Sequence, residues 1–83
     1  MKRIGVIAII IEEDRRSAAE VNAVLSEYSE CIIVRTGVPN HAEDLNIISL
    51  IVKATNEEVG AITGRLGKLS GVSVKSMMTS KSY

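Results

Sequence analysis

Residues 60–74 read GAITGRLGKLSGVSV, and this stretch decides the second half of the fold. Its glycines are spaced four, three and four residues apart, which places Gly60, Gly64 and Gly67 on one face of a helix. Gly71 suits the left-handed backbone that ends a helix, and the alternating Val-Ser-Val after it is typical of a strand. The stretch therefore predicts a helix, a tight turn and a strand in succession.

The three helical glycines need a compensating contact, because each one costs a helix up to ~1 kcal/mol relative to alanine. We assign Gly60, Gly64 and Gly67 to close packing or an interface, with the helix lying against a sheet or another helix. A ligand against the exposed backbone is the alternative. The segment from Gly64 to Gly67 also resembles the loop of KH nucleic-acid-binding domains, but the three residues before Gly71 leave no room for that motif's second helix.

Nearer the N-terminus, the apolar pattern predicts a strand and then a helix. Residues 3–12 are apolar at both alternate positions, as in a central strand with both faces covered. Apolar side chains then recur at helical spacing over residues 18–28, with the helix ending close behind them. Asp14 or Ser17 is the expected N-cap of this helix.

Two further strands are predicted in the middle of the chain. Residues 31–35 predict a second strand because Ile32, Ile33 and Val34 at its centre are β-branched. We expect residues 36–44, which include Gly37 and Pro39, to interrupt that strand. Pro39 cannot donate to a sheet ladder, so it belongs at an edge or in a loop. Residues 45–54 form the third strand, with apolar side chains on both faces.

The complete order is β-α-β-β-α-β. Residues 55–58 resemble a capped helix start, residues 72–78 form the last strand, and residues 79–83 resemble a frayed tail. We expect one domain over residues 1–83 with the α+β, ferredoxin-like fold, in which a four-stranded antiparallel sheet carries both helices on one face.

The helix-free face of such a sheet is expected to expose apolar side chains, which indicates a partner. We expect some of Ile7, Ile9, Ile47 and Ile51 to remain uncovered. The sequence therefore predicts a homo-oligomer, a homodimer or homotetramer, paired through this face or through an edge strand.

Composition narrows the function further. Ten basic residues balance ten acidic ones, so the chain lacks the basic surface typical of nucleic-acid-binding proteins. A single cysteine fits a reducing compartment, and acidic residues follow the first apolar run where a signal-peptide cleavage site would lie. No apolar run is long enough to span a membrane. We expect a cytoplasmic protein with no membrane partner.

Catalysis and cofactors have little support in the sequence. Cys31 and His41 are the only thiol and imidazole ligands, whereas a structural zinc site usually needs four ligands. No nucleophile motif, phosphate loop or dinucleotide fingerprint is present. The acidic residues 12–14 are more typical of a cap than of an acid–base pair. We expect no enzyme, no metal site and no cofactor.

Four segments together resemble the small family of iron-only hydrogenase system regulators, which are transcriptional regulators of anaerobic bacteria. The resemblance covers almost the whole chain and rests on residues 21–22, 35–39, 46–48 and 60–74. It implies a ferredoxin-like fold similar to ACT domains and to the C-terminal domain of the nickel-responsive repressor. Those relatives are oligomeric and bind effectors at subunit interfaces.

Two features of these relatives are missing from the sequence, namely the repressor's histidine-rich ligand set and any ribbon-helix-helix or helix-turn-helix segment. Neither nickel binding nor direct DNA contact is therefore carried over to this chain. The resemblance implies a small ligand-sensing module that regulates transcription through a separate DNA-binding protein. The alternatives are a structural oligomerisation subunit without an effector and, less favoured, a direct nucleic-acid binder.

The expected effector site is the turn after the first strand, the position that ACT-like folds use. Backbone N–H groups at a helix N-terminus favour an anion, and an arginine can clamp a carboxylate with two parallel hydrogen bonds. A glycine lets the chain approach a ligand closely, and a proline stiffens the turn. The ligand-binding candidates are Glu13, Asp14, Arg15, Arg35, Gly37 and Pro39.

Overall fold

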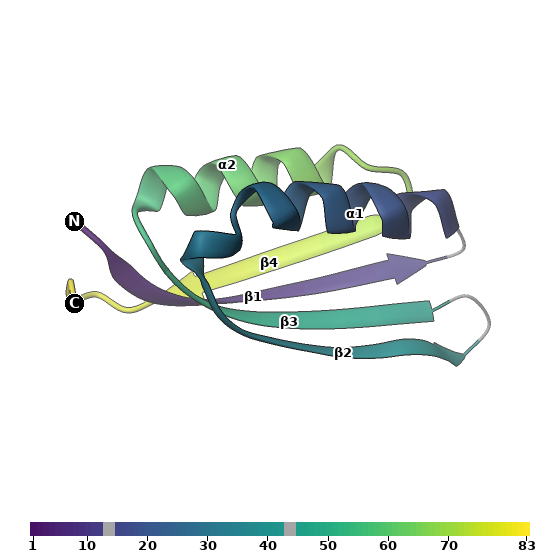
Figure 1. The fold of residues 1–83 in the computed structure, drawn as a ribbon, viewed down its shortest axis with the longest axis horizontal. Helices are drawn as coiled ribbons and strands as arrows, with labels where there is room; N and C mark the ends of the chain where they lie inside the picture. Colours follow the sequence, from purple (N-terminus) through teal and green to yellow (C-terminus); the bar gives the residue numbers. More distant parts are fainter. Residues whose placement is uncertain (13–14, 43–44) are drawn as a thin grey trace.

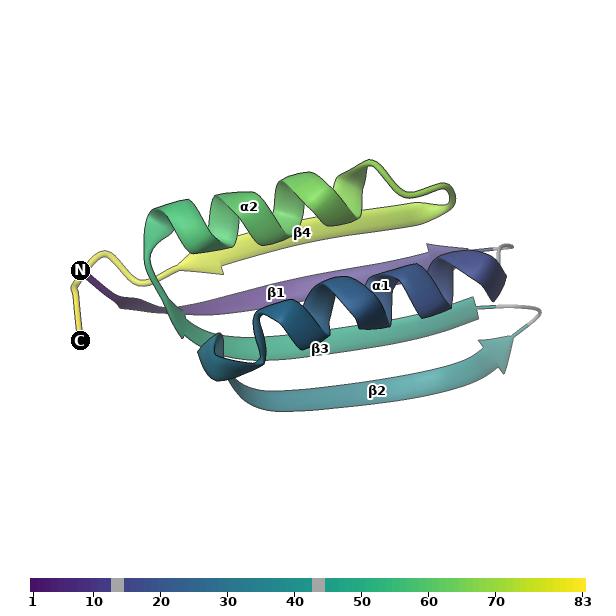
Figure 2. The ribbon, with the colours of Figure 1, turned by 45° about the horizontal axis from the view of Figure 1, so that its top comes forward.

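The computed structural model describes residues 1–12, 15–42 and 45–83 of the chain. The protein has two layers (Figures 1 and 2). One layer is a four-stranded antiparallel sheet, and the other is formed by the two helices, which cover one face of the sheet. The strands are β1 (Arg3–Glu12), β2 (Ile32–Ala42), β3 (Leu45–Ala54) and β4 (Val72–Met78), and the helices are α1 (Arg15–Glu27) and α2 (Asn56–Gly67). A short 3-10 turn, η1 (Ser29–Cys31), joins α1 to β2.

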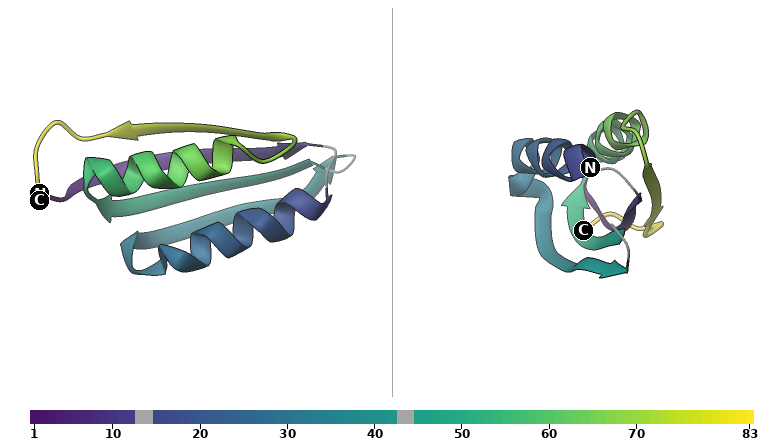
Figure 3. Two further views of the ribbon diagram at one scale, coloured as in Figure 1. Left: turned by 90° about the horizontal axis from the view of Figure 1, so that it is seen from above. Right: turned by 90° about the vertical axis from the view of Figure 1, so that its right-hand side faces the viewer.

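The strand order β2-β3-β1-β4 and the two-layer arrangement confirm the predicted ferredoxin-like fold. The end-on view in Figure 3 shows both helices on the same side of the twisted sheet, and the two termini lie near each other at one end of the molecule in Figure 1. β1 pairs with β3 over its whole length and with β4 on its other side. It is therefore the central strand that the doubly apolar pattern predicts.

The core lies between the helices and the sheet. Its buried side chains come from alternate positions of β1 and β3 and from one face of each helix, namely Ile7, Ile9, Ile11, Val21, Val24, Leu25, Ile48, Leu50, Val52, Ala54, Val59, Ile62 and Leu66. Some of Ile7, Ile9, Ile47 and Ile51 were expected to remain uncovered, and of these four Ile7 and Ile9 lie buried beneath the helices. Ile47 and Ile51 lie on the uncovered face, as expected.

β2 is longer than the sequence predicts, and residues 36–42 continue the strand. The expected interruption is wrong because β3 offers pairing partners along this stretch, with Thr36 opposite Ser49 and Val38 opposite Ile47. Pro39 falls in an irregularity between Val38 and Ala42. It lies on an edge strand, as expected, where a missing N–H costs no ladder hydrogen bond.

The ends of the helices are fixed by specific contacts. Thr55 caps α2 in a capping box with Glu58, and Gly71 has a φ of 71°, the left-handed conformation predicted for it. Ser17 is not the cap of α1. It lies inside the helix, is buried, and donates a hydrogen bond of 2.5 Å to the carbonyl of Ser70. This bond ties α1 to the turn that follows α2.

The face of α2 that carries Gly60 and Gly64 points away from the rest of the chain. A Cβ at either position would meet no atom within 4 Å, and one at Gly67 would meet the Val74 side chain at 3.9 Å. The expected close packing of Gly60 and Gly64 against another element of the same chain is therefore wrong. Packing of this face against a second chain stays a prediction.

Candidate functional site

A groove opens on the helix-covered side of the sheet, between α1 and the strands β2 and β3. Its volume is about 380 Å³, and its floor is formed by the buried side chains of Ile11 and Ile48. Ala18 and Asn22 line it from α1, Arg35 and Gly37 from β2, and Asn46 from β3. The groove thus combines an apolar floor with three polar side chains at its walls.

A bulge in β2 is what brings Arg35 into this groove. Ile32 lies opposite Val52 but Val34 lies opposite Ile51, so one extra residue, Ile33, enters the strand. In a regular strand a shift by one residue moves every following side chain to the other face. Because of the bulge, Arg35 pairs with Leu50, whose side chain is buried beneath the helices. Bulges commonly re-aim a side chain in this way.

Arg35 is held at the groove by α1. Its guanidinium donates a short hydrogen bond to the side-chain oxygen of Asn22. A guanidinium carries five N–H donors in a planar fork, so this bond orients the group and uses only part of its capacity. A smaller hollow of about 230 Å³ lies on the other side of Arg35, between α1 and the start of β2. Arg35 therefore lines both hollows.

Gly37 lies two positions further along β2, opposite Ile48 on the groove floor. A Cβ added at Gly37 would approach the carbonyl oxygen of Ile47 at 3.7 Å, which is ordinary contact. The glycine is therefore not required by crowding within the chain. Its missing side chain leaves room above the groove floor.

The structure brings together Arg35 and Gly37, two of the predicted ligand-binding residues. Glu13 and Asp14 lie outside the described residues. Arg15 begins α1, and Pro39 lies within β2, but their side chains are also outside what the structure describes. The described part of the groove comes from the end of β1, from β2, β3 and α1. The expected grouping of Arg35 with the first residues of α1 stays a prediction.

Asn22 and Asn46 also line the groove, and they were not among the predicted site residues. A signal was present in the sequence. Asn22 follows the apolar Val21 in the first helix, and Asn46 stands between Leu45 and Ile47 near the start of the third strand. Side-chain amides at such positions commonly have a hydrogen-bonding role.

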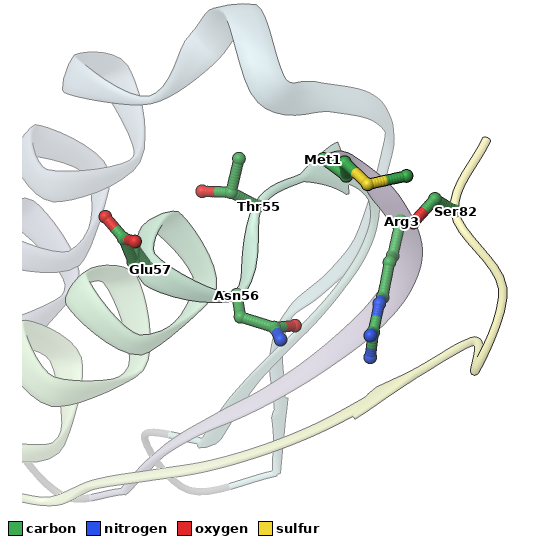
Figure 4. A pocket seen from close by; sticks show the side chains of 6 residues that line it. All are labelled: Met1, Arg3, Thr55, Asn56, Glu57 and Ser82. Atoms are coloured by element: carbon green, nitrogen blue, oxygen red, sulfur yellow. The ribbon is translucent and has the colours of Figure 1, made fainter.

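A second cavity, of about 330 Å³, lies near the two termini. Figure 4 shows its lining, with Met1 and Arg3 at the start of β1, Thr55 to Glu57 at the start of α2, and Ser82 in the C-terminal tail. The capping box already occupies donors at this helix end. Glu57 adds a negative charge there. Arg3 adds a positive charge, so the charges of the lining oppose each other and do not favour an anion.

A further polar contact joins the side chains of Cys31 and Glu58, near the start of α2. The thiol donates to the Glu58 carboxylate over 3.1 Å. Burial and this hydrogen bond raise the pKa of Cys31, while the backbone N–H of Thr55 and the thiol lower the pKa of Glu58. A raised thiol pKa is typical of a structural cysteine.

In residues 1–12, 15–42 and 45–83, no group of three or more histidine, cysteine or acidic side chains is placed to hold a metal ion. Within the same ranges, neither helix has the length and apolar character needed to cross a membrane.

Comparison with known proteins places this arrangement in context. Residues 3–76 match the TM1266-like family, described as "Iron-only hydrogenase system regulator, putative". The structure of the uncharacterized protein TM1266 from Thermotoga maritima is 37% identical, with a TM-score of 0.89 over 94% of this chain and 98% of that one. No curated protein is similar in sequence.

More distant structures share the fold alone. The ACT domain of GTP pyrophosphokinase from Chlorobium tepidum is 20% identical, with a TM-score of 0.71 over 93% of this chain and all of that one, 100%. The C-terminal domain of the MgtC protein from Mycobacterium tuberculosis is 11% identical, with a TM-score of 0.72 over 99% of this chain and 93% of that one. These likenesses confirm the ACT-like fold expected from the sequence.

Proposed function

Since the chain belongs to the TM1266-like family of iron-only hydrogenase system regulators, we propose that it is an oligomeric, ligand-sensing regulatory module. The groove between α1 and β2 is its effector site. It acts as a non-enzymatic sensor, and the regulatory signal reaches DNA through a separate DNA-binding protein.

The observation that carries this proposal is the position of Arg35 above an apolar floor. An arginine fork is suited to carboxylates, and the side chains of Ile11 and Ile48 are suited to a short aliphatic body. Ligand sites are typically apolar with a few convergent polar groups. We therefore propose a small carboxylate with a branched or short aliphatic chain as the class of effector.

The proposal that a partner protein contacts DNA rests on the packing of the helices and on the net charge. In the described ranges, α1 and α2 both pack on the sheet through their apolar faces. The net charge of zero gives no electrostatic attraction to the phosphate backbone. A structural oligomerisation subunit without an effector is the second candidate, and the apolar side chains on the helix-free face of the sheet favour it.

Titration with isovalerate, followed by two-dimensional NMR, tests the effector site. We expect amide shifts at residues 35–37 and on α1, and we expect at least ~10-fold weaker binding of the neutral analogue isovaleramide, because a charge-assisted bond is lost. Arg35→Ala should remove the difference between the two probes without changing the oligomeric state.

Lys68→Ala provides the matched control, because Lys68 is an exposed cation at the end of α2, away from the groove. It should bind isovalerate like the parent protein. If isovalerate and isovaleramide bind equally weakly to the parent, or if Arg35→Ala falls apart into monomers, the carboxylate clamp is wrong and Arg35 has a structural role.

A further inference from the structure

The side of the sheet that faces away from the helices carries a band of large apolar side chains. Two cross-strand pairs form its middle, Val6 with Ile51 and Ile10 with Ile47. Further apolar residues extend it onto both edge strands. We call this surface the open sheet face; its exposed apolar residues are Val6, Ile10, Val34, Val38, Ile47, Ile51 and Met77.

Between the two cross-strand pairs, the side chains of the open sheet face are small. Ala8 lies opposite Ser49, between the two branched cross-strand pairs. The Ser49 hydroxyl is 2.5 Å from that of Thr36 on the neighbouring strand. A small centre surrounded by branched side chains gives the surface relief into which a second, similar surface can interdigitate.

The two ends of the open sheet face carry opposite charges. Side chains alternate along a strand, so Glu12 projects on the same side as Val6 and Ile10, and Lys53 on the same side as Ile47 and Ile51. Glu12 pairs with Leu45 at one end of the β1–β3 ladder, and Lys53 pairs with Ile4 at the other. The surface is therefore polarised along the strand direction.

From this polarity we infer that the open sheet face is covered by a second copy of this chain, with its strands running in the reverse direction. A two-fold axis lying between the sheets and across the strands places the Glu12 end of each copy against the partner's Lys53 end. An axis along the strands would instead bring the two Glu12 ends together. Lys75 of the edge strand β4 lies opposite Ala8 and so belongs to the same face, at mid-length between the two charged ends. At the edge of the sheet its long side chain reaches solvent beside the interface.

The size of the surface fits a dimer of modest strength. Four strands spaced ~4.8 Å apart and about eight residues long at ~3.3 Å each cover on the order of 500 Å² per copy. Two such surfaces together reach about 1,000 Å², the lower limit of specific interfaces. Single substitutions should therefore change the monomer–dimer equilibrium measurably. This inference rests on the oligomer in the proposed function and adds its surface and orientation.

Sedimentation equilibrium at low salt tests the proposed dimer, first its surface and then its orientation. Ile51→Asp places a charge in the middle of the open sheet face without touching the core, and we expect it to weaken the dimer at least ~100-fold. Circular dichroism should show that the variant keeps the fold. A parent protein that is monomeric at micromolar concentration, or a dimer that survives Ile51→Asp, overturns the inference.

Charge reversal tests the orientation. Glu12→Lys and Lys53→Glu each convert two attractive contacts of the symmetric dimer into repulsive ones, and each should raise its Kd on the order of 10-fold. The double variant should recover the parent Kd, and the differences should shrink at 1 M salt. Glu20→Lys, on the exposed side of α1, is the matched control and should dimerise normally. Loss of the dimer without recovery in the double variant refutes the reversed arrangement.

The proposed effector site and the proposed dimer can be refuted independently of each other. The groove lies on the helix-covered side of the sheet, and the open sheet face lies on the other. If Ile51→Asp is monomeric but still discriminates isovalerate from isovaleramide, the dimer surface and the effector site are both supported. A dimeric parent that binds neither probe removes the proposed effector and leaves the dimer intact.

Discussion

Arg35 of β2 donates a hydrogen bond to the side-chain oxygen of Asn22 on α1, across a separation of 13 positions in the chain. This bond joins the edge of the sheet to the helix layer at the mouth of the groove. It also determines which way the guanidinium points, since the planar group turns as one unit. Asn22 is therefore a positioning residue for the proposed carboxylate clamp.

Replacing Asn22 by Asp tests this role. The new carboxylate would pair with Arg35 and compete with a carboxylate ligand for its N–H donors. We expect isovalerate to bind about 10-fold more weakly to Asn22→Asp, with little change in thermal stability because the pair is exposed. Asn22→Ala removes the hydrogen bond that positions Arg35 but adds no competing carboxylate. Its affinity for isovalerate should therefore lie between those of the parent and of Asn22→Asp. Equal affinity in all three proteins would show that Asn22 does not act on the ligand.

The capping box at the start of α2 gives a prediction about stability. The Thr55 hydroxyl accepts a hydrogen bond from the Glu58 N–H over 3.1 Å, and the Glu58 carboxylate accepts one from the Thr55 N–H over 2.9 Å. Loss of an N-cap typically costs about 1 kcal/mol, or ~4–8 °C in Tm for a domain of this size. Differential scanning calorimetry of Thr55→Ala should show this loss. Thr55→Ser keeps the hydroxyl and should melt near the parent, so an equal loss would argue against the cap.

The Glu58 carboxylate also predicts a dependence of stability on pH. The Thr55 N–H and the Cys31 thiol hold its pKa below the ordinary value of 4.5. The folded state thus binds this proton less readily than the unfolded state does, and stability falls as the pH drops from about 4.5 through the folded-state value. Urea unfolding of the parent and of Glu58→Gln from pH 6 to 3 checks this. The variant should lose less stability across that range, and parallel curves would contradict the shifted pKa.

Cys31 should react slowly with thiol reagents. Its side chain is only 6% exposed, and burial, followed by the hydrogen bond to Glu58, raises its pKa above the ordinary 9.0. The reactive thiolate is therefore scarce at pH 8. We expect iodoacetamide to modify the native protein at least ~100-fold more slowly than the urea-unfolded protein, since modification must wait for opening. Comparable rates in the two states would show that the thiol is accessible.

The element order was sufficient to predict the sheet order, and the apolar pattern was sufficient to predict the central strand. Residues 3–12 are apolar on both faces, and their central position follows from that alone. The pattern could not show which face the helices cover, because Ile7 and Ile10 are equivalent in sequence. Ile7 is buried and Ile10 is exposed, and only the packing of the helices distinguishes them.

The candidate site was predictable only in part, and the reason lies in the bulge at Ile33. Residues 32–34 read Ile-Ile-Val, so no polar residue marks the extra position or the change of face behind it. A regular strand would have placed Arg35 opposite Ser49, on the open sheet face. The arginine was identified through its chemistry, while its place in the groove depends on a backbone irregularity that β-branched residues conceal.

The glycines of α2 lead to the last prediction, in which the outcome expected from the sequence is reversed. Gly64 was expected to be a position where a side chain would cause a clash. In the structure a Cβ at Gly64 meets no atom within 4 Å, and its φ is not left-handed. Alanine is therefore sterically compatible with the folded chain at this position.

We expect Gly64→Ala to stabilise the protein by up to ~1 kcal/mol, because alanine loses less backbone entropy than glycine when a helix forms. Thermal melting measured at several protein concentrations is the test. Gly60→Ala offers a second, equivalent site on the same face of α2 and should behave alike. If Gly64→Ala instead lowers the Tm and raises the dimer or tetramer Kd, then Gly64 packs against another chain. The face of α2 would then be a second interface in addition to the open sheet face.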